Sequence, residues 1–309
     1  MLRYIENKEI DRIKWDTTIE EAKNGLIYVY SWWLDSVSVH WDALVYGDYE
    51  IIMPLIWNKK WGLKSIYPPF EVQQLGIFFK KTLHQAQFDQ FFEAIPKEFQ
   101  QINLTLNTQN NFKTPKYTRW QANNYILDLN KPYNNLRKGY NSNTKRNIKK
   151  AKNLILQNKG EWTATQCIAL FKEQKAHELK MDEAYYQRME VVMKTSIMHN
   201  KGAIWGIIDE KGMVHAIAFF AFSHNRLYNL MPATRIEGKK SGAMFFLLDQ
   251  LIQKHAETSN TLDFEGSMAE GVARFYRGFG AIVEHYWHIG HNRMSWYHKG
   301  AYRAVKWLR

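Results

Sequence analysis

The elements that the sequence predicts follow the same order in both halves of the chain. Each half begins with a strand pair around a turn, continues with a further strand and a helix, and ends on another strand. Equivalent points keep a nearly constant offset, because Gly47 and Gly212 are 165 residues apart and Ile102 and Leu262 are 160 residues apart. This offset favours an internal duplication, although the halves hardly match in sequence and a common element order can also recur by chance.

Apolar periodicity and turn residues place these elements along the chain. In the first half we expect a helix over residues 83–94 and strands over 42–46, 49–57, 66–67, 73–79 and 102–106. In the second half we expect a helix over residues 243–258 and strands over 203–208, 213–222, 227–232 and 262–264. Further helices are predicted over residues 164–175 and 182–199, and a basic helix begins with Ser142 as its N-cap.

A polar stretch with a proline, around residues 128–140, has the composition of a linker. We therefore predict an α/β (α+β) chain of two domains, residues 1–130 and 131–309, each a mixed sheet flanked by helices.

The stretch from Thr261 to Ala281 combines acidic residues with a strand, a turn and a helix. Acidic residues at the end of a strand lie where open α/β sheets carry their chemistry. Asp263 and Glu265 are two apart and on a strand would share a face, so one carboxylate can act as a general base while the other orients the substrate. Tyr276, on the following helix, can protonate a leaving group. The alternative is structural: Asp263 caps the turn, Glu265 faces water and Tyr276 belongs to the core.

The segment from Thr234 to Ala243 is rich in glycine and lysine and precedes a long predicted helix. Backbone N–H groups at a helix N-terminus bind phosphates through fixed donors and the helix dipole. We therefore assign donor phosphate binding to this segment and to the basic helix, with the residues Arg235, Gly238, Lys239, Ser241, Gly242, Lys145, Arg146 and Lys149. The alternatives are a turn that only connects two elements and a solvated helix face.

Positive charge is concentrated beside the predicted domain junction. The chain has a formal net charge of +12, and residues 129–160 include nine basic residues and no acid. Such a cluster predicts a polyanionic partner, such as nucleic acid, a phosphorylated substrate or anionic lipid, and a solvated basic face is the alternative of equal weight.

Cysteine and histidine residues exclude several kinds of chemistry. The single cysteine, Cys167, lies in an apolar helix pattern, so we assign it to the core and expect a reducing compartment.

The N-terminus has no apolar h-region and the longest apolar run, residues 216–222, is too short to span a bilayer. We therefore expect a cytoplasmic protein and leave peripheral attachment at the inner face of the membrane open. His285, His288 and His291 alternate between the faces of a predicted strand, so we expect no metal site.

Three separated segments resemble the FemABX-like family. Residues 142–152 contain the pattern Lys-Arg-x-Ile-x-Lys-Ala, and residues 67–76 resemble the signature of the family's first domain. Residues 263–267, Asp-Phe-Glu-Gly-Ser, resemble its closing motif together with residues 273–276 and 279–280. The resemblance implies two tandem GNAT-like domains. Because residues 73–79 of the first half contain no Gly-rich segment comparable to residues 234–243, we infer that the first domain shapes the acceptor site and that the second binds the donor and catalyses. Members of this family transfer an aminoacyl group from aminoacyl-tRNA to an amine on a cell-wall precursor, and related proteins are acyltransferases.

The chain departs from the GNAT pattern in one motif. GNAT enzymes that use acetyl-CoA carry Arg/Gln-x-x-Gly-x-Gly/Ala. Arg235 and Gly238 fit this pattern, but Lys240 stands at its last position and the next glycine is Gly242. The coiled-coil arm of some family members is also absent from the sequence.

These observations predict an acyltransferase that forms an amide on an amine acceptor, by FemABX-like transfer of an aminoacyl or acyl group to a cell-envelope precursor. Asp263, Glu265 and Tyr276 are the predicted catalytic residues. The predicted acceptor-side residues are Phe70, Gln73, Gln74, Ser267 and Arg274. The donor is aminoacyl-tRNA or acyl-CoA as a co-substrate, with no tightly bound cofactor and no metal, and the acceptor's association with a membrane is left open. The alternatives are an acetyl-CoA-dependent GNAT N-acetyltransferase and a non-catalytic basic module that binds nucleic acid or an anionic surface.

Overall fold

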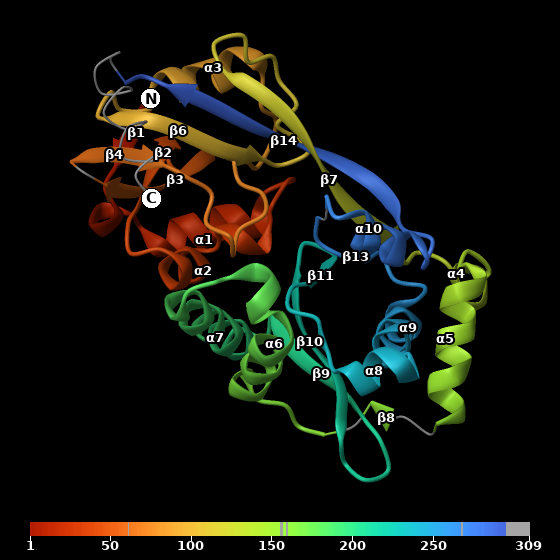
Figure 1. Ribbon diagram of the computed structural model, residues 1–309. Coiled ribbons are helices and arrows are strands. Elements are labelled where there is room, and N and C mark those ends of the chain that lie inside the picture. The colour runs from red at the N-terminus through yellow and green to blue at the C-terminus, as the bar shows by residue number, and fades with distance from the viewer. Residues whose placement is uncertain (61, 155–156, 159, 267, 295–309) are drawn as a thin grey trace. The chain divides into compact units, whose positions relative to one another are not determined.

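The structure is a computed structural model that describes residues 1–60, 62–154, 157–158, 160–266 and 268–294 (Figure 1). Its contacts divide the chain into two compact units. Among the described residues, unit 1 contains those from Met1 to Ala122 and from Tyr286 to Met294, and unit 2 contains those from Asn123 to His285. This grouping differs from a simple boundary between residues 130 and 131, because the last described strand pairs within unit 1.

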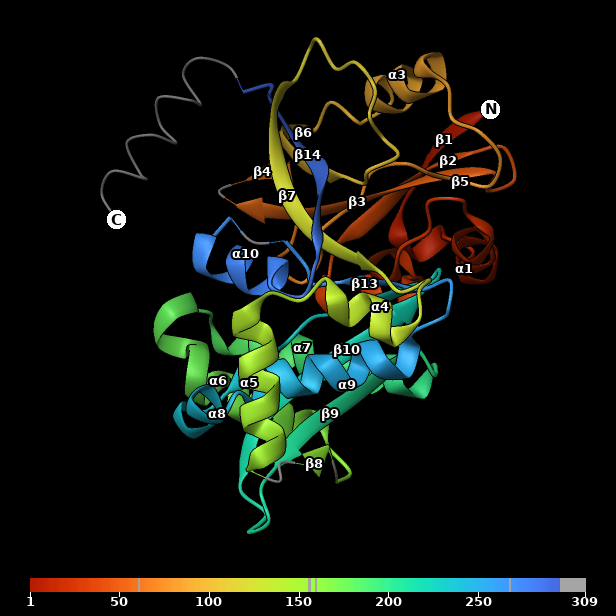
Figure 2. The ribbon, with the colours of Figure 1, turned by 90° about the vertical axis from the view of Figure 1, so that its right-hand side faces the viewer.

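Unit 1 is a mixed sheet with helices on both faces. Its strands lie in the order β1 (Leu2–Ile5), β2 (Trp41–Tyr46), β3 (Ile51–Lys60), β4 (Leu63–Ile66), β6 (Phe99–Leu106) and β14 (Ile282–Asn292), and β5 (Phe78–Phe79) pairs with β3. The first residues of β14, up to His285, belong to unit 2. Each neighbouring pair is antiparallel except β4 and β6, which are parallel. Figures 1 and 2 show α3 (Gln85–Glu93) on one side of this sheet and α1 (Arg12–Glu21) and α2 (Ser31–Val37) on the other.

Unit 2 repeats this plan. Its strands lie in the order β7 (Thr118–Asp128), β13 (Thr261–Asp263), β11 (Arg226–Asn229), β10 (Val214–Ser223), β9 (Gly202–Ile208) and β8 (Gln157–Asn158), with β12 (Ala233–Thr234) on β10. Only the β11–β13 pair is parallel among the pairings described in this unit. One face is covered by α5 (Ser142–Asn153), α8 (Ile236–Ser241) and α9 (Ala243–His255), and the other by α6 (Ala164–Leu179) and α7 (Glu183–Met198) (Figure 2). Two further helices are α4 (Tyr133–Lys138) and α10 (Glu270–Arg277).

The two units have equivalent topologies, as the repeated element order predicts. In each unit the parallel pair is joined through a helix, by α3 between β4 and β6 and by α9 between β11 and β13. Beyond this pair each sheet continues with an antiparallel strand from a distant part of the chain. The strand that follows β6 in sequence, β7, pairs in unit 2, whereas β14, which comes after β13, pairs with β6 in unit 1. The fold-class prediction of two tandem α/β domains is therefore confirmed.

Helices α5 and α9 show why the apolar periodicity of unit 2 identifies its elements correctly. In α5 the buried positions are Thr144, Ile148 and Ala151, which share one face at helical spacing and pack against α9. The remaining faces of α5 carry lysine, arginine and asparagine. Its N-cap is Asn141, whose side chain accepts the N–H of Thr144 at 2.8 Å, so the assignment of Ser142 as N-cap is wrong by one residue.

One other local prediction is corrected by the structure. The strand expected over residues 73–79 is reduced to Phe78–Phe79, because Gly76 adopts a left-handed φ of +100° that interrupts the extended run. Leu75 alone forms an isolated bridge with Leu106. Within the described residues, no helix combines the length and the apolar character needed to cross a bilayer.

Candidate functional site

Asp263 lies at the end of β13, in the centre of a buried polar cluster in unit 2. Asp263 is 1% exposed. One carboxylate oxygen accepts hydrogen bonds from Arg226 Nη1 at 2.6 Å and Asn124 Nδ2 at 3.1 Å. The other accepts the backbone N–H of Glu265 at 2.8 Å. Asp263 therefore caps the turn and forms a buried ion pair, which is the structural alternative that the sequence left open.

Arg226 connects Asp263 to a second carboxylate. Its guanidinium also donates to Glu284 Oε2 at 3.0 Å and Oε1 at 3.2 Å. Burial lowers the pKa of Arg226, but Asp263 and Glu284 more than reverse this effect, so that the pKa is raised and the guanidinium stays charged. Burial raises the pKa of the Asp263 carboxyl, and the adjacent Arg226 opposes that shift. Removing either the guanidinium or its carboxylate partners would leave a buried charge unpaired, which is strongly destabilising.

Sequence reasoning missed Arg226, Asn124 and Glu284. These residues come from β11, β7 and β14, and only strand pairing brings them to the end of β13. The available signal was weak: Glu284 is the last acid in the chain, and Arg226 opens a strand whose other positions are mostly apolar.

Glu265 does not share a strand face with Asp263, so that expectation is wrong. The strand β13 ends at Asp263, and Glu265 adopts a left-handed φ of +64° in the following turn. A left-handed φ in a residue other than glycine is uncommon and recurs at functional sites. Glu265 is half-buried, whereas Asp263 is almost completely enclosed. Of the two carboxylates, Glu265 is therefore the one that a substrate can reach more easily.

Tyr276 lies on α10 and packs beneath this turn. It is 7% exposed, and its ring stacks on Phe264 with the ring centroids 4.8 Å apart. Burial raises the pKa of the Tyr276 phenol, and the negative charges of Glu265 and Asp263 raise it further. A raised pKa keeps the hydroxyl protonated at neutral pH, which suits a hydrogen-bond or proton donor.

The glycine-rich segment before α9 is a short helix rather than an open loop. A Cβ on Gly238 would lie 1.9 Å from His215 O, and one on Gly242 would lie 2.5 Å from Asn147 O. Both glycines therefore allow close backbone packing against β10 and α5. Gly242 also has a left-handed φ of +79°, which ends α8 and starts α9.

Two polar residues of this segment have partners within the chain, and two lysines are exposed. Ser241 is buried, donates to Gly238 O at 3.2 Å and lies 3.0 Å from His215 Nδ1. Arg235 Nη2 forms an ion pair with Glu173 at 3.3 Å. Only Lys239 and Lys240 extend from α8 as exposed cations.

The basic helix α5 presents its charges to solvent. Its exposed cations are Lys145, Arg146, Lys149, Lys150 and Lys152. In the part of the chain that the structure describes, no acidic side chain forms an ion pair with any of these five cations. Arg146 Nη2 instead donates to Asn143 Oδ1 at 2.8 Å, and Lys145 Nζ to Lys138 O at 3.2 Å. This face therefore offers charge to an external anion.

The predicted acceptor-side residues are distributed over both units. In unit 1, Phe70 is 63% exposed, and buried Gln74 donates to Gln73 Oε1 at 2.8 Å. In unit 2, Arg274 is exposed on α10. Ser267 lies outside the described residues.

The three histidines of β14 and Cys167 all contact neighbouring side chains or lie in the core. His285 contacts Asn123 Oδ1 at 2.9 Å, His288 stacks on Trp120 with centroids 5.1 Å apart, and His291 lies 5.0 Å from the Tyr117 ring. Among the described residues, no group of histidine, cysteine and acidic side chains has the geometry of a metal site. Cys167 is buried, as predicted, and burial raises the pKa of its thiol to about 12.

Comparisons with known proteins identify the fold. No protein-family model matches the sequence, and no curated protein does. Among solved structures, FemX matches with a TM-score of 0.63 and 10% identity, over 92% of this chain and 96% of that chain. A tandem GNAT protein from the clavulanic acid biosynthesis pathway matches with a TM-score of 0.57 and 11% identity, over 96% and 99% of the two chains. L-PGS from Bacillus licheniformis matches with a TM-score of 0.54 and 10% identity, over 92% of each chain.

The chain therefore has the tandem GNAT-type fold that these proteins share. At such identities the likeness shows the fold, and at that level the resemblance to the FemABX-like family is confirmed.

Proposed function

We propose that this protein is an acyltransferase that forms an amide on an amine acceptor and takes an aminoacyl group from aminoacyl-tRNA. The proposal is carried by the turn after β13, where half-buried Glu265 and protonated Tyr276 lie next to the ion-paired Asp263. The fold of FemX supports the reaction class, and the FemABX-like motifs support an acceptor in the cell envelope.

In the proposed reaction the acceptor amine attacks the carbonyl carbon of the aminoacyl ester. Glu265 accepts the proton that the amine loses, and the C–N bond forms as the ester C–O bond breaks. Tyr276 transfers its phenolic proton to the departing oxygen, which leaves as the ribose hydroxyl of the tRNA, and the proton held by Glu265 then restores the phenol. Asp263 and Arg226 position the turn that carries Glu265. Because the ester is already activated, alignment of the amine is the main contribution of the protein.

The choice of tRNA as donor follows from α5 and α8. The five exposed cations of α5 extend over a helix of about 18 Å, which matches several phosphates along a nucleic acid backbone. By contrast, the glycines expected to receive a CoA pyrophosphate pack against His215 O and Asn147 O of the same chain. Lys145, Arg146, Lys149 and Lys239 are the donor-binding residues in this proposal, while Phe70, Gln73, Gln74, Ser267 and Arg274 are assigned to the acceptor side.

Donor binding is tested with labelled aminoacyl-tRNA and, separately, labelled acetyl-CoA. We expect tRNA binding that weakens steeply with salt, and a loss of at least tenfold in the double variant Lys145→Glu/Arg146→Glu. Lys8→Glu/Lys59→Glu, at exposed positions of unit 1, is the charge-matched control and should bind tRNA as the unmodified protein does. Preference for acetyl-CoA, or equal loss in both double variants, contradicts the choice of donor.

Chemistry is tested on Glu265 and Tyr276. With aminoacyl-tRNA and an amine-bearing envelope precursor, Glu265→Gln should lower the transfer rate by about 10²–10⁴-fold while tRNA affinity stays within twofold. Tyr276→Phe should lower the rate less, because the ring still packs on Phe264. If Glu265→Gln transfers at an unchanged rate, Glu265 is not the general base.

Two other functions have an observation in their favour. The fold shared with a tandem GNAT protein supports an acetyl-CoA-dependent N-acetyltransferase, which predicts acetyl transfer that is insensitive to the α5 variants. The enclosure of Asp263 by Arg226 and Asn124 favours a non-catalytic basic module. That module predicts salt-dependent binding of nucleic acid and no transfer to any amine.

A further inference from the structure

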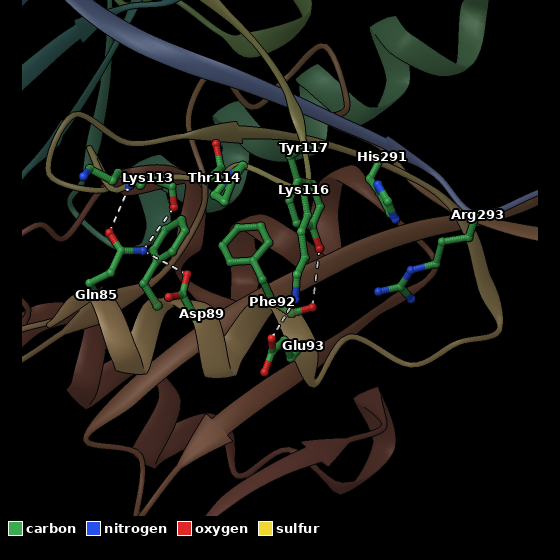
Figure 3. A pocket seen from close by; sticks show the side chains of 12 residues that line it. Gln85, Asp89, Phe92, Glu93, Lys113, Thr114, Lys116, Tyr117, His291 and Arg293 are labelled. Carbon is green, nitrogen blue, oxygen red and sulfur yellow. Dashed lines mark hydrogen bonds and ion pairs between the residues drawn. The ribbon is translucent and has the colours of Figure 1, made fainter.

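A pocket in unit 1 contains none of the residues assigned to transfer. Its volume is about 510 Å³, which is a common size for a small-molecule site. It lies between α3, the segment 113–117 and the end of β14 (Figure 3). Its lining residues are Gln85, Phe88, Asp89, Phe92, Glu93, Lys113, Thr114, Pro115, Lys116, Tyr117, His291 and Arg293.

Aromatic rings form the wall of this pocket. The rings of Phe88 and Phe92 have centroids 4.5 Å apart, and Phe92 meets Tyr117 edge to face at 5.2 Å. Tyr117 in turn lies 5.0 Å from His291, so the aromatic surface continues to the end of β14. Such a wall favours an apolar body, and a planar aromatic group gains additional edge and stacking contacts.

The acids of the pocket already have partners. Glu93 forms an ion pair with Lys116 at 3.0 Å. Asp89 accepts a hydrogen bond from Gln85 Nε2 at 2.9 Å, and Gln85 Oε1 accepts the backbone N–H of Lys113 at 3.0 Å. Because these interactions hold α3 against the segment 113–117, they fix the width of the pocket.

Arg293 has a different environment. Its Nη1 donates to Ile95 O at 3.1 Å and to Pro96 O at 3.0 Å, which fixes the guanidinium without neutralising it. No acid within the described ranges forms an ion pair with Arg293. Figure 3 shows Arg293 and His291 on the side of the pocket opposite Gln85 and Lys113. A held guanidinium without a counter-ion is a favourable partner for a carboxylate.

We propose that this pocket binds a small carboxylate with an aromatic body. The carboxylate pairs with Arg293, and the aromatic body lies against Phe92 and Tyr117. The pocket uses residues of unit 1 alone, so the proposal is independent of the transfer reaction assigned to unit 2.

The protein is titrated with 3-phenylpropionate and with two comparison probes, the neutral isostere 3-phenylpropionamide and the cationic 3-phenylpropylamine, by ligand-observed NMR. We expect 3-phenylpropionate to bind in the millimolar range and at least tenfold more tightly than either probe. Its affinity should fall as salt is added, because the guanidinium is only partly buried. Equal binding of all three probes, or binding of none, overturns the proposal.

Two variants with matched controls locate the binding. Thr114→Trp fills the pocket and should weaken 3-phenylpropionate at least tenfold, whereas Thr82→Trp, at an exposed position outside the pocket, should not. Arg293→Gln should remove the preference for the carboxylate probe, whereas Arg3→Gln, which loses a comparable bond to Gly47 O, should keep it. Thr114 is half-buried in an irregular segment and makes no ion pair, so its variant keeps the test valid if Arg293→Gln unfolds. Unchanged binding in Thr114→Trp places the ligand elsewhere and contradicts the assignment.

Discussion

The two units place different polar groups at the end of the second strand of the parallel pair. In unit 1, Asn107 follows β6, is 2% exposed, donates to Leu75 O at 3.0 Å and accepts from Asn24 Nδ2 at 3.2 Å. In unit 2, Asp263 ends β13 and is held by Arg226 and Asn124. Neutral amides close the turn in unit 1, while unit 2 buries charge. A buried charge costs more than a buried amide unless it is paired, and in unit 2 Arg226 supplies the partner of Asp263.

The largest effect should come from Arg226. Arg226→Ala leaves Asp263 and Glu284 without their cation, so we expect a loss of about 3–5 kcal/mol in the free energy of unfolding, measured by urea denaturation. Arg3→Ala, an exposed arginine that donates to one backbone carbonyl, should cost less than about 0.5 kcal/mol. A loss below about 1 kcal/mol for Arg226→Ala would mean that the charged cluster is not energetically different from the amide cluster of unit 1.

The amide cluster should respond less strongly. Asn107→Ala removes the donor to Leu75 O and the acceptor for Asn24, for which we expect a loss of about 1–3 kcal/mol in the same assay. This loss should not change between pH 5 and pH 8, because neither amide titrates. Asn153→Ala, an exposed position on α5, serves as the control and should stay within about 0.5 kcal/mol. If Asn107→Ala proves as costly as Arg226→Ala, the contrast between the two turns fails.

The smallest effect concerns one half-buried histidine in each unit. Burial lowers the pKa of His288 in unit 1 and of His255 in unit 2 below the ordinary value of 6.5. The unfolded chain therefore binds more protons than the folded chain, and stability present above pH 6.5 is lost as the pH falls through the folded pKa values. We expect His288→Gln and His255→Gln each to reduce this pH dependence by at most about 1 kcal/mol in thermal melts from pH 8 to pH 5. If either variant loses stability more steeply than the unmodified protein as the pH falls, the pKa of that histidine is not lowered by folding.

Local sequence patterns predict the element order and the duplication because they depend on periodicity within single helices and strands. The face of α5 formed by Thr144, Ile148 and Ala151 is an example. The position of Asp263 at the end of a strand was predictable for the same reason. Its partners were not, because Arg226 and Glu284 reach it only through the pairing of strands far apart in sequence. Backbone conformation was the second obstacle, since the left-handed φ of Glu265 in a non-glycine residue leaves no signature in sequence.

The pairing of β14 with β6 also bears on how the chain is synthesised. Ile289 pairs with Leu104, so the two strands are made on the order of 180 residues apart. At about 5–20 residues per second, the ribosome exposes β6 for on the order of ten seconds or more before β14 exists. Throughout this interval the edge of β6 is open to wrong partners. In unit 2, β7 likewise precedes its partner β13, since Leu127 pairs with Leu262. Both units therefore contain an early strand that waits for a late partner, and β6 waits for longer than β7.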